Sequence, residues 1–458
     1  MKYNHLNSYE WIGDFWLENT KNTKFPGLLT YSPSKGIRLV TLQYTFDKDY
    51  HDSFLTIHGY THETGCITLL RCISAGTLSL KGSSCNPTYL CEKLIIGGHY
   101  SINNYFSSIS VGFNNLNEFC YPQGFSAEDE YTTSNIVESN INHKGKSISV
   151  SLKQEAVGIF IIPTLSRLFL MGDKEEDLKE RINSDFNDLL EKYDLKTSTI
   201  KKEITYVFNI SEKNINEDLD ILDHMSIIFS IMSLLSVLML RKIKPTSITA
   251  HDKTTNKICH ILNTFYITES DIESLRKDTN HNLLPLNLKD IKSDFQNSFA
   301  VWHGLFSEKL NIRVSTILNH ILDNIDHVQH FILLLTTLEQ ISMNEYENYK
   351  GSEKYSWAIN KYSSPSLLHK LNTLSPVGVS IGEHISNLRI CIIHPKSLES
   401  KKYDKYKNHI SIQSIYNISQ MLFVILVHSL YVSIDLNSSA TEKFINRHDF
   451  FIKTYHEY

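Results

Sequence analysis

The stretch that decides the fold class is Leu28-Leu-Thr-Tyr-Ser-Pro-Ser-Lys-Gly-Ile-Arg-Leu-Val-Thr-Leu-Gln-Tyr-Thr-Phe46. Its two ends, 28–32 and 37–46, are runs rich in apolar, β-branched and aromatic residues, which are typical of strands. Pro33 to Gly36 lies between these runs and supplies residues that favour a turn. The stretch therefore predicts two strands joined by a turn.

More short strands are predicted after this pair. They lie at 53–58, 66–72, 94–96, 108–113, 147–152, 158–163 and 205–210, with Gly, Asn and Pro between them. Many short strands in succession favour a sandwich or a barrel-like sheet. One helix interrupts them, because Asp173 and Glu176 could form a capping box ahead of an apolar face that extends to Tyr193.

From Leu219 onward the sequence is predicted to be almost entirely helical. Apolar stripes at helical spacing run from Ile325 to Ile341 and from Ile412 to Leu426, with a shorter helix at 379–393 and a polar loop at 344–364. Such faces must cover one another, so a helical bundle is expected. We predict an α+β protein with a β-rich N-terminal domain at 1–215, a helical connecting region at 216–300 and an all-α bundle at 301–458.

Bulk properties limit the classes of function. The chain has 458 residues and a formal net charge of -5, so nucleic-acid binding would need a local basic patch. The N-terminus has no apolar signal segment, from which we infer a cytoplasmic protein with reduced cysteines. The apolar run from Met225 to Leu240 is interrupted by serines and shorter than the ~18 residues a bilayer needs, so a buried helix is predicted and no membrane partner.

The candidate chemistry lies in Leu388-Arg389-Ile390-Cys391-Ile392-Ile393-His394-Pro395. Five positions along a continuous helix rotate a side chain by roughly 500°, so Arg389 and His394 would not share a face. Proline pushes the preceding residue out of the helical region, which predicts that His394 ends the helix. His394 could then turn toward the side on which Arg389 projects.

An arginine and a histidine suit RNA cleavage without a metal or cofactor. An imidazole exchanges protons near neutral pH, so His394 could take the proton of a ribose 2′-hydroxyl or give one to the leaving oxygen. Arg389 could bind the phosphate as negative charge builds. Chance alone produces such pairs, and Arg313 with His320 is a second one. We favour Arg389 and His394 because they lie between two long apolar-faced helices.

A lysine-rich stretch follows the motif directly. Its cations are Lys396, Lys401, Lys402, Lys405 and Lys407, with Tyr403 and Tyr406 between them. Positive charge with interleaved aromatic rings suits a contact surface for single-stranded RNA. The alternative is a solvated loop, whose charge Glu399 and Asp404 moderate.

Cysteine chemistry is a weaker candidate. Cys66, Cys72, Cys85 and Cys91 lie within 26 residues, but no C-x2-C spacing occurs, and burial in strands is favoured over zinc binding. Cys391 is flanked by isoleucines, which favours core packing over a nucleophilic role.

These residues resemble two known families. Arg, four residues and then His is similar to the signature of HEPN ribonucleases, although Ile390 stands where a polar residue is frequent. The N-terminal part resembles the ApeA N-terminal domain. The residues that match it are Trp11, Trp16, Pro26-Gly-Leu-Leu-Thr-Tyr31, Ile57-His-Gly59, Thr68-Leu-Leu-Arg-Cys72, Ile95-Ile-Gly-Gly98, Ser108-Ile-Ser-Val-Gly-Phe113 and Leu116.

The resemblance implies an abortive-infection antiphage effector with a phage-derived trigger. It implies cleavage of tRNA or other single-stranded RNA by a homodimer of HEPN domains, and it gives Glu339 the place of a recurrent helix glutamate. The bland alternative for Glu339 is an exposed helix residue. Two other functions stay open: an inactive dimerising protein whose β-rich domain binds a partner, and a carbohydrate-binding β-sandwich with a helical appendage.

Overall fold

The computed structural model describes most of the chain. The described ranges are 3–18, 20–41, 54–75, 88–120, 135–161, 200–213, 219–276, 283–308, 312–321, 326–345 and 351–447, with single positions between 181 and 192. The helix predicted at 173–193, residues 42–46 and Cys85 lie wholly or almost wholly outside these ranges.

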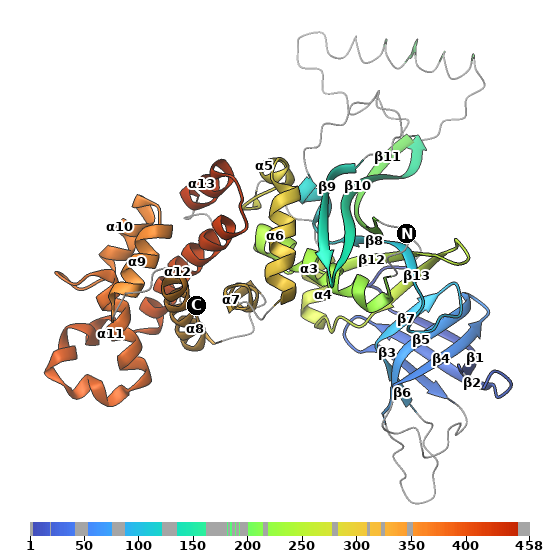
Figure 1. The fold of residues 1–458 in the computed structure, drawn as a ribbon, viewed down its shortest axis with the longest axis horizontal. Coiled ribbons are helices and arrows are strands. Elements are labelled where there is room, and N and C mark those ends of the chain that lie inside the picture. The colour runs from blue at the N-terminus through green and yellow to red at the C-terminus, as the bar shows by residue number, and fades with distance from the viewer. Residues whose placement is uncertain are drawn as a thin grey trace, which may run out of the picture.

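The N-terminal strands close into a six-stranded barrel (Figure 1, blue). Around the barrel the order is β4–β1–β2–β3–β6–β5, and β5 pairs again with β4. The strands are β1 (Tyr9–Leu17), β2 (Phe25–Ser32), β3 (Gly36–Thr41), β4 (Leu55–Thr61), β5 (Gly65–Ser74) and β6 (Thr88–Cys91). The predicted β-rich domain is thus confirmed, and of its two predicted forms the barrel is observed.

Alternation along β2 explains how the barrel is filled. Phe25, Gly27, Leu29 and Tyr31 are buried, and the residues that alternate with them are half-buried. This period of two places one face of the strand in the barrel core. The predicted turn before β3 is also observed, and Gly36 adopts a φ of 75°, which glycine tolerates without steric cost.

A second set of strands extends the same sheet beyond the barrel. From β5 the order continues β7–β13–β12–β8–β11–β10–β9. These strands are β7 (Lys93–Ile96), β8 (Phe106–Phe113), β9 (Asn135–His143), β10 (Lys146–Ile161), β11 (Ile200–Glu212), β12 (Pro245–Asp252) and β13 (Ile258–Asn263).

The prediction of a helical connecting region at 216–300 is wrong at β12 and β13. β12 pairs with β8, and β13 pairs with β7, so both complete the sheet. Each is short, and β12 begins with a proline and mixes small polar with apolar residues. Pairing with strands that lie 132 to 170 residues earlier therefore decides their conformation.

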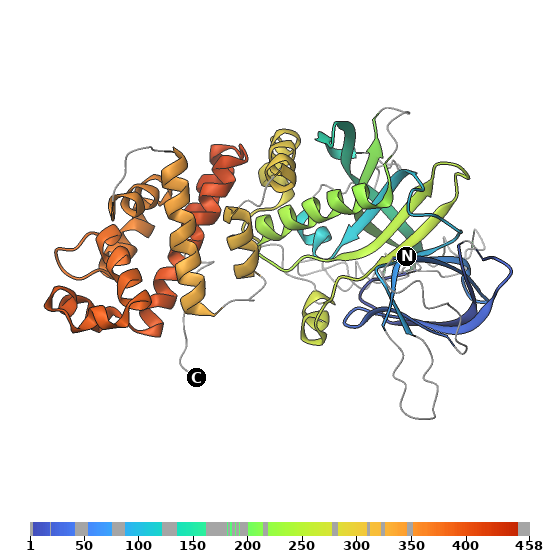
Figure 2. The same ribbon diagram turned by 60° about the horizontal axis from the view of Figure 1, so that its bottom comes forward.

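The helix α3 (Ile221–Met239) lies along this extended sheet (Figure 2, green). It contains the apolar run that was predicted to be a buried helix, and that prediction is confirmed, since Ile227, Leu234 and Leu238 are almost completely buried. Among the described residues, α3 and α12 (Ile412–Ser433) are long and apolar enough to cross a membrane, but about three quarters of each is buried inside the protein.

The remaining helices follow α3 in the chain, and those from α7 onward gather at the opposite end of the molecule from the barrel, whereas α4 lies beside the extended sheet (Figure 1). They are α4 (Glu269–Arg276), α5 (Leu288–Ile291), α6 (Phe295–Glu308), α7 (Ile312–Ile321), α8 (His327–Glu345), α9 (Glu353–Tyr362), α10 (Pro365–Thr373), α11 (Ile381–Ile393), α12 and α13 (Ser438–Asn446). A five-residue helix, α1 (Leu116–Cys120), follows β8. The three predicted helices of this region are confirmed as α8, α11 and α12.

The loop predicted at 344–364 is wrong, because α9 occupies most of its second half. The buried residues of α9 are Tyr355, Ala358, Ile359 and Tyr362, which follow helical spacing. Two of these four are tyrosines and one is alanine, so the apolar stripe is weak in sequence. The two lysines of the helix, Lys354 and Lys361, form ion pairs with α8.

Two hydrophobic cores divide the described residues, and the division does not follow the predicted domains. One, the barrel core, contains Phe15, Leu29 and Leu69. The other, the larger core, runs from Ile109 in the extended sheet through α3 and α6 to residues such as Phe444. The predicted boundary at residue 300 falls within α6, where Trp302 is fully buried and its Nε1 donates to the Ser230 carbonyl at 2.9 Å.

Candidate functional site

The helix α11 positions the predicted Arg-His pair. It begins at Ser380, whose side chain accepts from the Glu383 backbone N–H, and its last helical residue is Ile393. His394 has a φ of -124° and ψ of 76°, and Pro395 starts the short 3-10 helix η4 (Pro395–Glu399). The prediction that proline places His394 at the helix end is confirmed. The His394 side chain is exposed.

Arg389 is held by residues of two other helices. Its Nη1 donates to Glu339 Oε2 on α8 at 2.8 Å and to the Tyr355 hydroxyl on α9 at 2.8 Å. The Tyr355 hydroxyl donates to the same Glu339 oxygen at 3.2 Å, and Lys354 forms an ion pair with Glu339 Oε1. The structure thus brings together the predicted Glu339 and Arg389. Lys354 and Tyr355 were missed because α9 was predicted to be a loop.

The cluster of Arg389, Glu339, Lys354 and Tyr355, here called the Arg389 cluster, is partly open to solvent. The Arg389 side chain is 31% exposed, Glu339 23% and Lys354 18%. Burial and the charge of Arg389 lower the pKa of Lys354. Within the described part of the chain, no hydrogen bond joins the Arg389 and His394 side chains, so the two flank the end of α11 without contact.

The alternative pair, Arg313 and His320, has different neighbours. Arg313 donates to the Ser429 carbonyl at 3.0 Å and lies 3.6 Å from Glu345. His320 packs against the rings of His330 and Phe423, with centroid separations of 4.4 and 3.8 Å. The structure thus gives these two residues separate partners.

The lysine-rich stretch forms a second 3-10 segment, η5 (Lys401–His409), against α11. Lys405 pairs with Glu383 at 3.3 Å and Lys407 with Asp404 at 2.7 Å. Lys396, Lys401 and Lys402 are exposed.

Tyr406 contradicts the expectation of a base-stacking ring. It is only 1% exposed, and its hydroxyl donates to Glu383 and accepts from Asn387. Tyr406 therefore anchors η5 to α11, while Tyr403 is half-buried beside Lys402.

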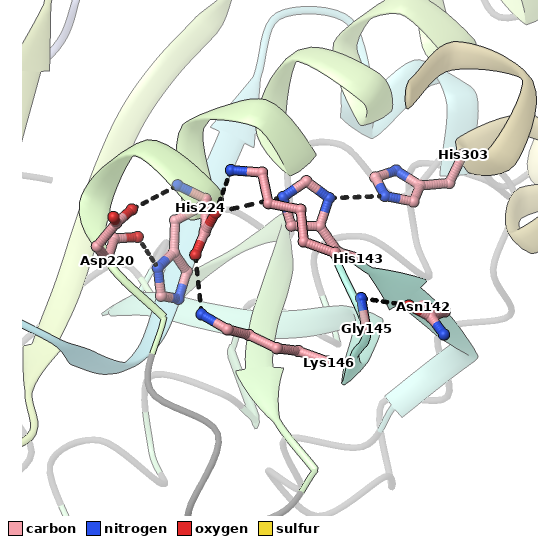
Figure 3. Close-up of polar contacts among 9 residues, drawn as sticks. Asn142, His143, Gly145, Lys146, Asp220, His224 and His303 are labelled. Carbon is pink, nitrogen blue, oxygen red and sulfur yellow. Dashed lines mark hydrogen bonds and ion pairs between the residues drawn. The ribbon is translucent and has the colours of Figure 1, made fainter. Parts of the chain in front are cut away.

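A buried histidine cluster joins β9, α3 and α6 (Figure 3), and sequence reasoning missed it. His143 Nδ1 lies 3.1 Å from His303 Nε2, and His143 Nε2 lies 3.6 Å from Asp223 Oδ1. His303 Nδ1 lies 3.1 Å from Ser230 Oγ. Because these residues are 73 to 160 positions apart, no local sequence motif predicts the cluster.

The lysines of the β9–β10 turn complete this histidine cluster. Lys144 and Lys146 donate to the two carboxylate oxygens of Asp223 at 2.7 and 3.1 Å. Burial lowers the pKa of His303 to about 4 and also lowers that of His143. One chain of donors fits two neutral rings: Ser230 to His303, His303 to His143, and His143 toward Asp223. The cluster is therefore a polar link between elements.

The cysteines provide no group of three metal ligands in the part of the chain that the structure describes. Cys72 and Cys91 are buried in the barrel, Cys66 is half-buried, and Cys85 lies outside the described residues. Cys391 is 2% exposed and burial raises the pKa of its thiol, in agreement with the predicted core packing.

Comparison with protein families identifies the N-terminal part. Residues 10–302 match the family model described as ApeA N-terminal domain 1, which is more than half of the chain. The chain belongs to the ApeA family. Membership in this family supports a role in antiphage defence. The match ends at Trp302 in α6, so it covers the barrel, the extended sheet, α3 and the first half of α6. No curated protein and no solved structure shows significant similarity.

Proposed function

We propose that this ApeA protein is a metal-independent RNA endonuclease that acts as an abortive-infection effector. Arg389 binds the scissile phosphate, and His394 is the general acid or base. The substrate is tRNA or another single-stranded RNA, and the protein acts in the cytoplasm after a phage-derived trigger. This function rests on the resemblance of Arg389 to His394 to the HEPN signature and on family membership.

The observation that carries the proposal is the arrangement at the end of α11. A partly exposed guanidinium, an exposed imidazole and exposed lysines of η4 and η5 follow one another within fourteen residues, from Arg389 to Lys402. A phosphodiester backbone needs cations that reach solvent, and proton transfer needs an accessible imidazole. Arg389 and the exposed lysines meet the first condition, and His394 meets the second.

The chemistry follows from these groups. The 2′-oxygen of a ribose forms a bond to the adjacent phosphorus as the bond from phosphorus to the 5′-oxygen breaks. A base takes the 2′-hydroxyl proton, and an acid supplies a proton to the departing 5′-oxygen. Arg389 stabilises the negative charge on the phosphoryl oxygens in the transition state.

The active unit in this proposal is a homodimer through the C-terminal helices. One imidazole cannot be both base and acid in the same step, and in this proposal a second copy brings a second His394 to the same phosphate. His394 and its neighbour Ile393, which is 47% exposed, lie at the surface and leave this face accessible to a twin.

RNA sequencing after induced expression tests the function directly. Wild type should produce new RNA ends within one or a few sequence contexts, and His394→Ala should produce none. Equal cleavage patterns from the two proteins would reject His394 as a catalytic residue. Absence of cleavage by both, in cells that carry the trigger, would reject the nuclease.

The second candidate is a non-enzymatic interaction protein. Two observations favour it: Arg389 is already engaged by Glu339 and Tyr355, and Ile390 replaces the usual polar residue. This candidate predicts that Arg389→Ala and His394→Ala both retain defence against phage. The nuclease predicts that both lose it.

A further inference from the structure

We propose that Lys354 is a second phosphate-binding residue, which Glu339 holds beside Arg389 for the same RNA strand. The inference rests on the proposed nuclease function and names a residue outside the Arg-His motif. It assigns a role to α9, the helix that carries Lys354 and Tyr355.

The carboxylate of Glu339 lies between two cations. Glu339 Oε2 accepts from Arg389 at 2.8 Å, and Glu339 Oε1 pairs with Lys354. The guanidinium and the ammonium therefore contact the two oxygens of one carboxylate, which holds both cations at the same site. Tyr355 contacts both Arg389 and Glu339, which fixes the orientation of the guanidinium.

The charge of the Arg389 cluster favours an anionic ligand. Arg389 and Lys354 carry two positive charges and Glu339 one negative charge, so the cluster has a net charge of about +1. The two cations also repel each other, which contributes to the lowered pKa of Lys354. A phosphodiester placed against both cations adds the missing negative charge and relieves this repulsion.

Arg389 and Lys354 have more N–H donors than the contacts with Glu339 and Tyr355 use. A guanidinium has five N–H donors and an ammonium has three. The bonds seen at Arg389 use Nη1, and the bond seen at Lys354 goes to one oxygen of Glu339. Both side chains reach solvent, with 31% and 18% of their surface exposed. Phosphate oxygens can therefore be bound without breaking the link to Glu339.

The chain contains a matched control on the same two helices. Seven residues after Lys354, Lys361 pairs with Glu345 at 2.6 Å, and Tyr362 donates to the same carboxylate at 2.7 Å. Arg313 lies 3.6 Å from Glu345 but also binds the Ser429 carbonyl and is only 15% exposed. This second cluster joins α8 to α9 in the same way, but it contains neither member of the Arg389–His394 motif.

The test compares Lys354→Gln with Lys361→Gln in RNA cleavage and RNA binding. Binding is measured on the full chain carrying His394→Ala, with a labelled single-stranded RNA oligonucleotide over a range of salt concentrations. Loss of one phosphate contact on a single strand should lower the slope of log affinity against log salt by ~0.7. Lys354→Gln should show this change and raise KM by about 10-fold with little change in kcat.

Controls separate a binding role from a structural one. Lys354→Arg should restore the salt slope, since it keeps the positive charge. Lys361→Gln removes the corresponding ion pair from the second cluster and should leave the slope and KM unchanged. Thermal unfolding of each variant shows whether it is folded. A loss of stability alone would not change the salt slope.

Several outcomes would overturn the proposal. If Lys354→Gln keeps the wild-type salt slope, or if Lys361→Gln lowers it equally, Lys354 is not a specific phosphate contact. If the protein binds no RNA at any salt concentration, both Lys354 and the nuclease function are rejected. If RNA is bound through Lys354 but the wild type does not cleave it, the nuclease function fails and the Lys354 contact stands.

Discussion

The strands of the barrel and those of the extended sheet belong to one continuous sheet, but the barrel and the rest of the fold have separate hydrophobic cores. The barrel core is filled by residues of its own six strands and of nearby segments, such as Phe15 and Leu29. The larger core continues from the extended sheet through α3 and α6 into α8 and α12. A continuous hydrogen-bonded sheet therefore does not correspond to a single hydrophobic core in this protein. The helix that carries Arg389 shares its core with the extended sheet.

The largest expected effect is the loss of Trp302. Trp302→Ala removes a fully buried indole and its hydrogen bond to Ser230, which should cost about 3–5 kcal/mol of unfolding free energy. Because the larger core is shared, the extended sheet and the C-terminal helices should lose stability together. Urea unfolding followed by far-UV circular dichroism, with limited proteolysis to locate the unfolded part, measures this.

A variant in the barrel core tests whether the barrel core and the larger core are independent. Phe15 is fully buried in the barrel core, and Phe15→Ala should cost a similar amount while the C-terminal helices remain resistant to protease. Simultaneous unfolding of both regions in Phe15→Ala would contradict the independence of the two cores.

The next largest effect is on catalysis. His394→Ala should lower RNA cleavage by about 10²-fold or more, the scale of losing a general acid or base. Ile12 lies on the barrel surface with 77% of its area exposed, and Ile12→Ser should cleave RNA at the wild-type rate. Equal losses in the two variants would place the activity outside α11.

Acid should destabilise the larger core. Burial lowers the pKa of His303 and of His224 to about 4, below the ordinary value of 6.5. The neutral rings therefore stabilise the fold fully above pH ~6.5, and this contribution is lost as pH falls toward about 4. Between pH 7.5 and 5.5 the loss per histidine should be about 1 kcal/mol. Urea unfolding at both pH values checks this.

His303→Gln isolates the histidine cluster in that experiment. Glutamine keeps donor and acceptor atoms but does not titrate in this range. The variant should lose less stability than the wild type between pH 7.5 and 5.5. An identical pH dependence would show that the His143–His303 contact does not contribute.

The smallest expected effect is that of a chelator. Arg389 and His394 supply charge and proton transfer by themselves, so cleavage in excess EDTA should equal cleavage without it. Loss of cleavage in EDTA, with recovery on adding magnesium or manganese, would contradict the metal-independent mechanism.

Sequence reasoning succeeded where a pattern was local. The runs on both sides of Pro33 to Gly36, the apolar stripe of α12 and the effect of Pro395 on His394 each depend on neighbouring residues. The structure also brings Glu339 to Arg389, a pair that only the family resemblance had brought together.

It failed where distant pairing decides the outcome. β12 and β13 became strands because β7 and β8 lie beside them, and barrel closure depends on the β4–β5 and β5–β6 pairings. The contact between His143 and His303 spans 160 residues. Tyr355 was missed because α9 is mostly polar and half of its stripe is tyrosine.

The position of α6 limits how the gene can recombine with those of relatives. The start of α6 binds both neighbours: Ser139 on β9 donates to the Gln296 carbonyl at 2.6 Å, and Ser298 donates to the Asp435 carbonyl beyond α12 at 3.3 Å. A crossover near residue 302 would separate Ser298 from Asp435, and His303 from His143 and Ser230, in each recombinant. Exchange of the helical region therefore preserves the fold only when β9, α3, α6 and α12 are inherited as a set.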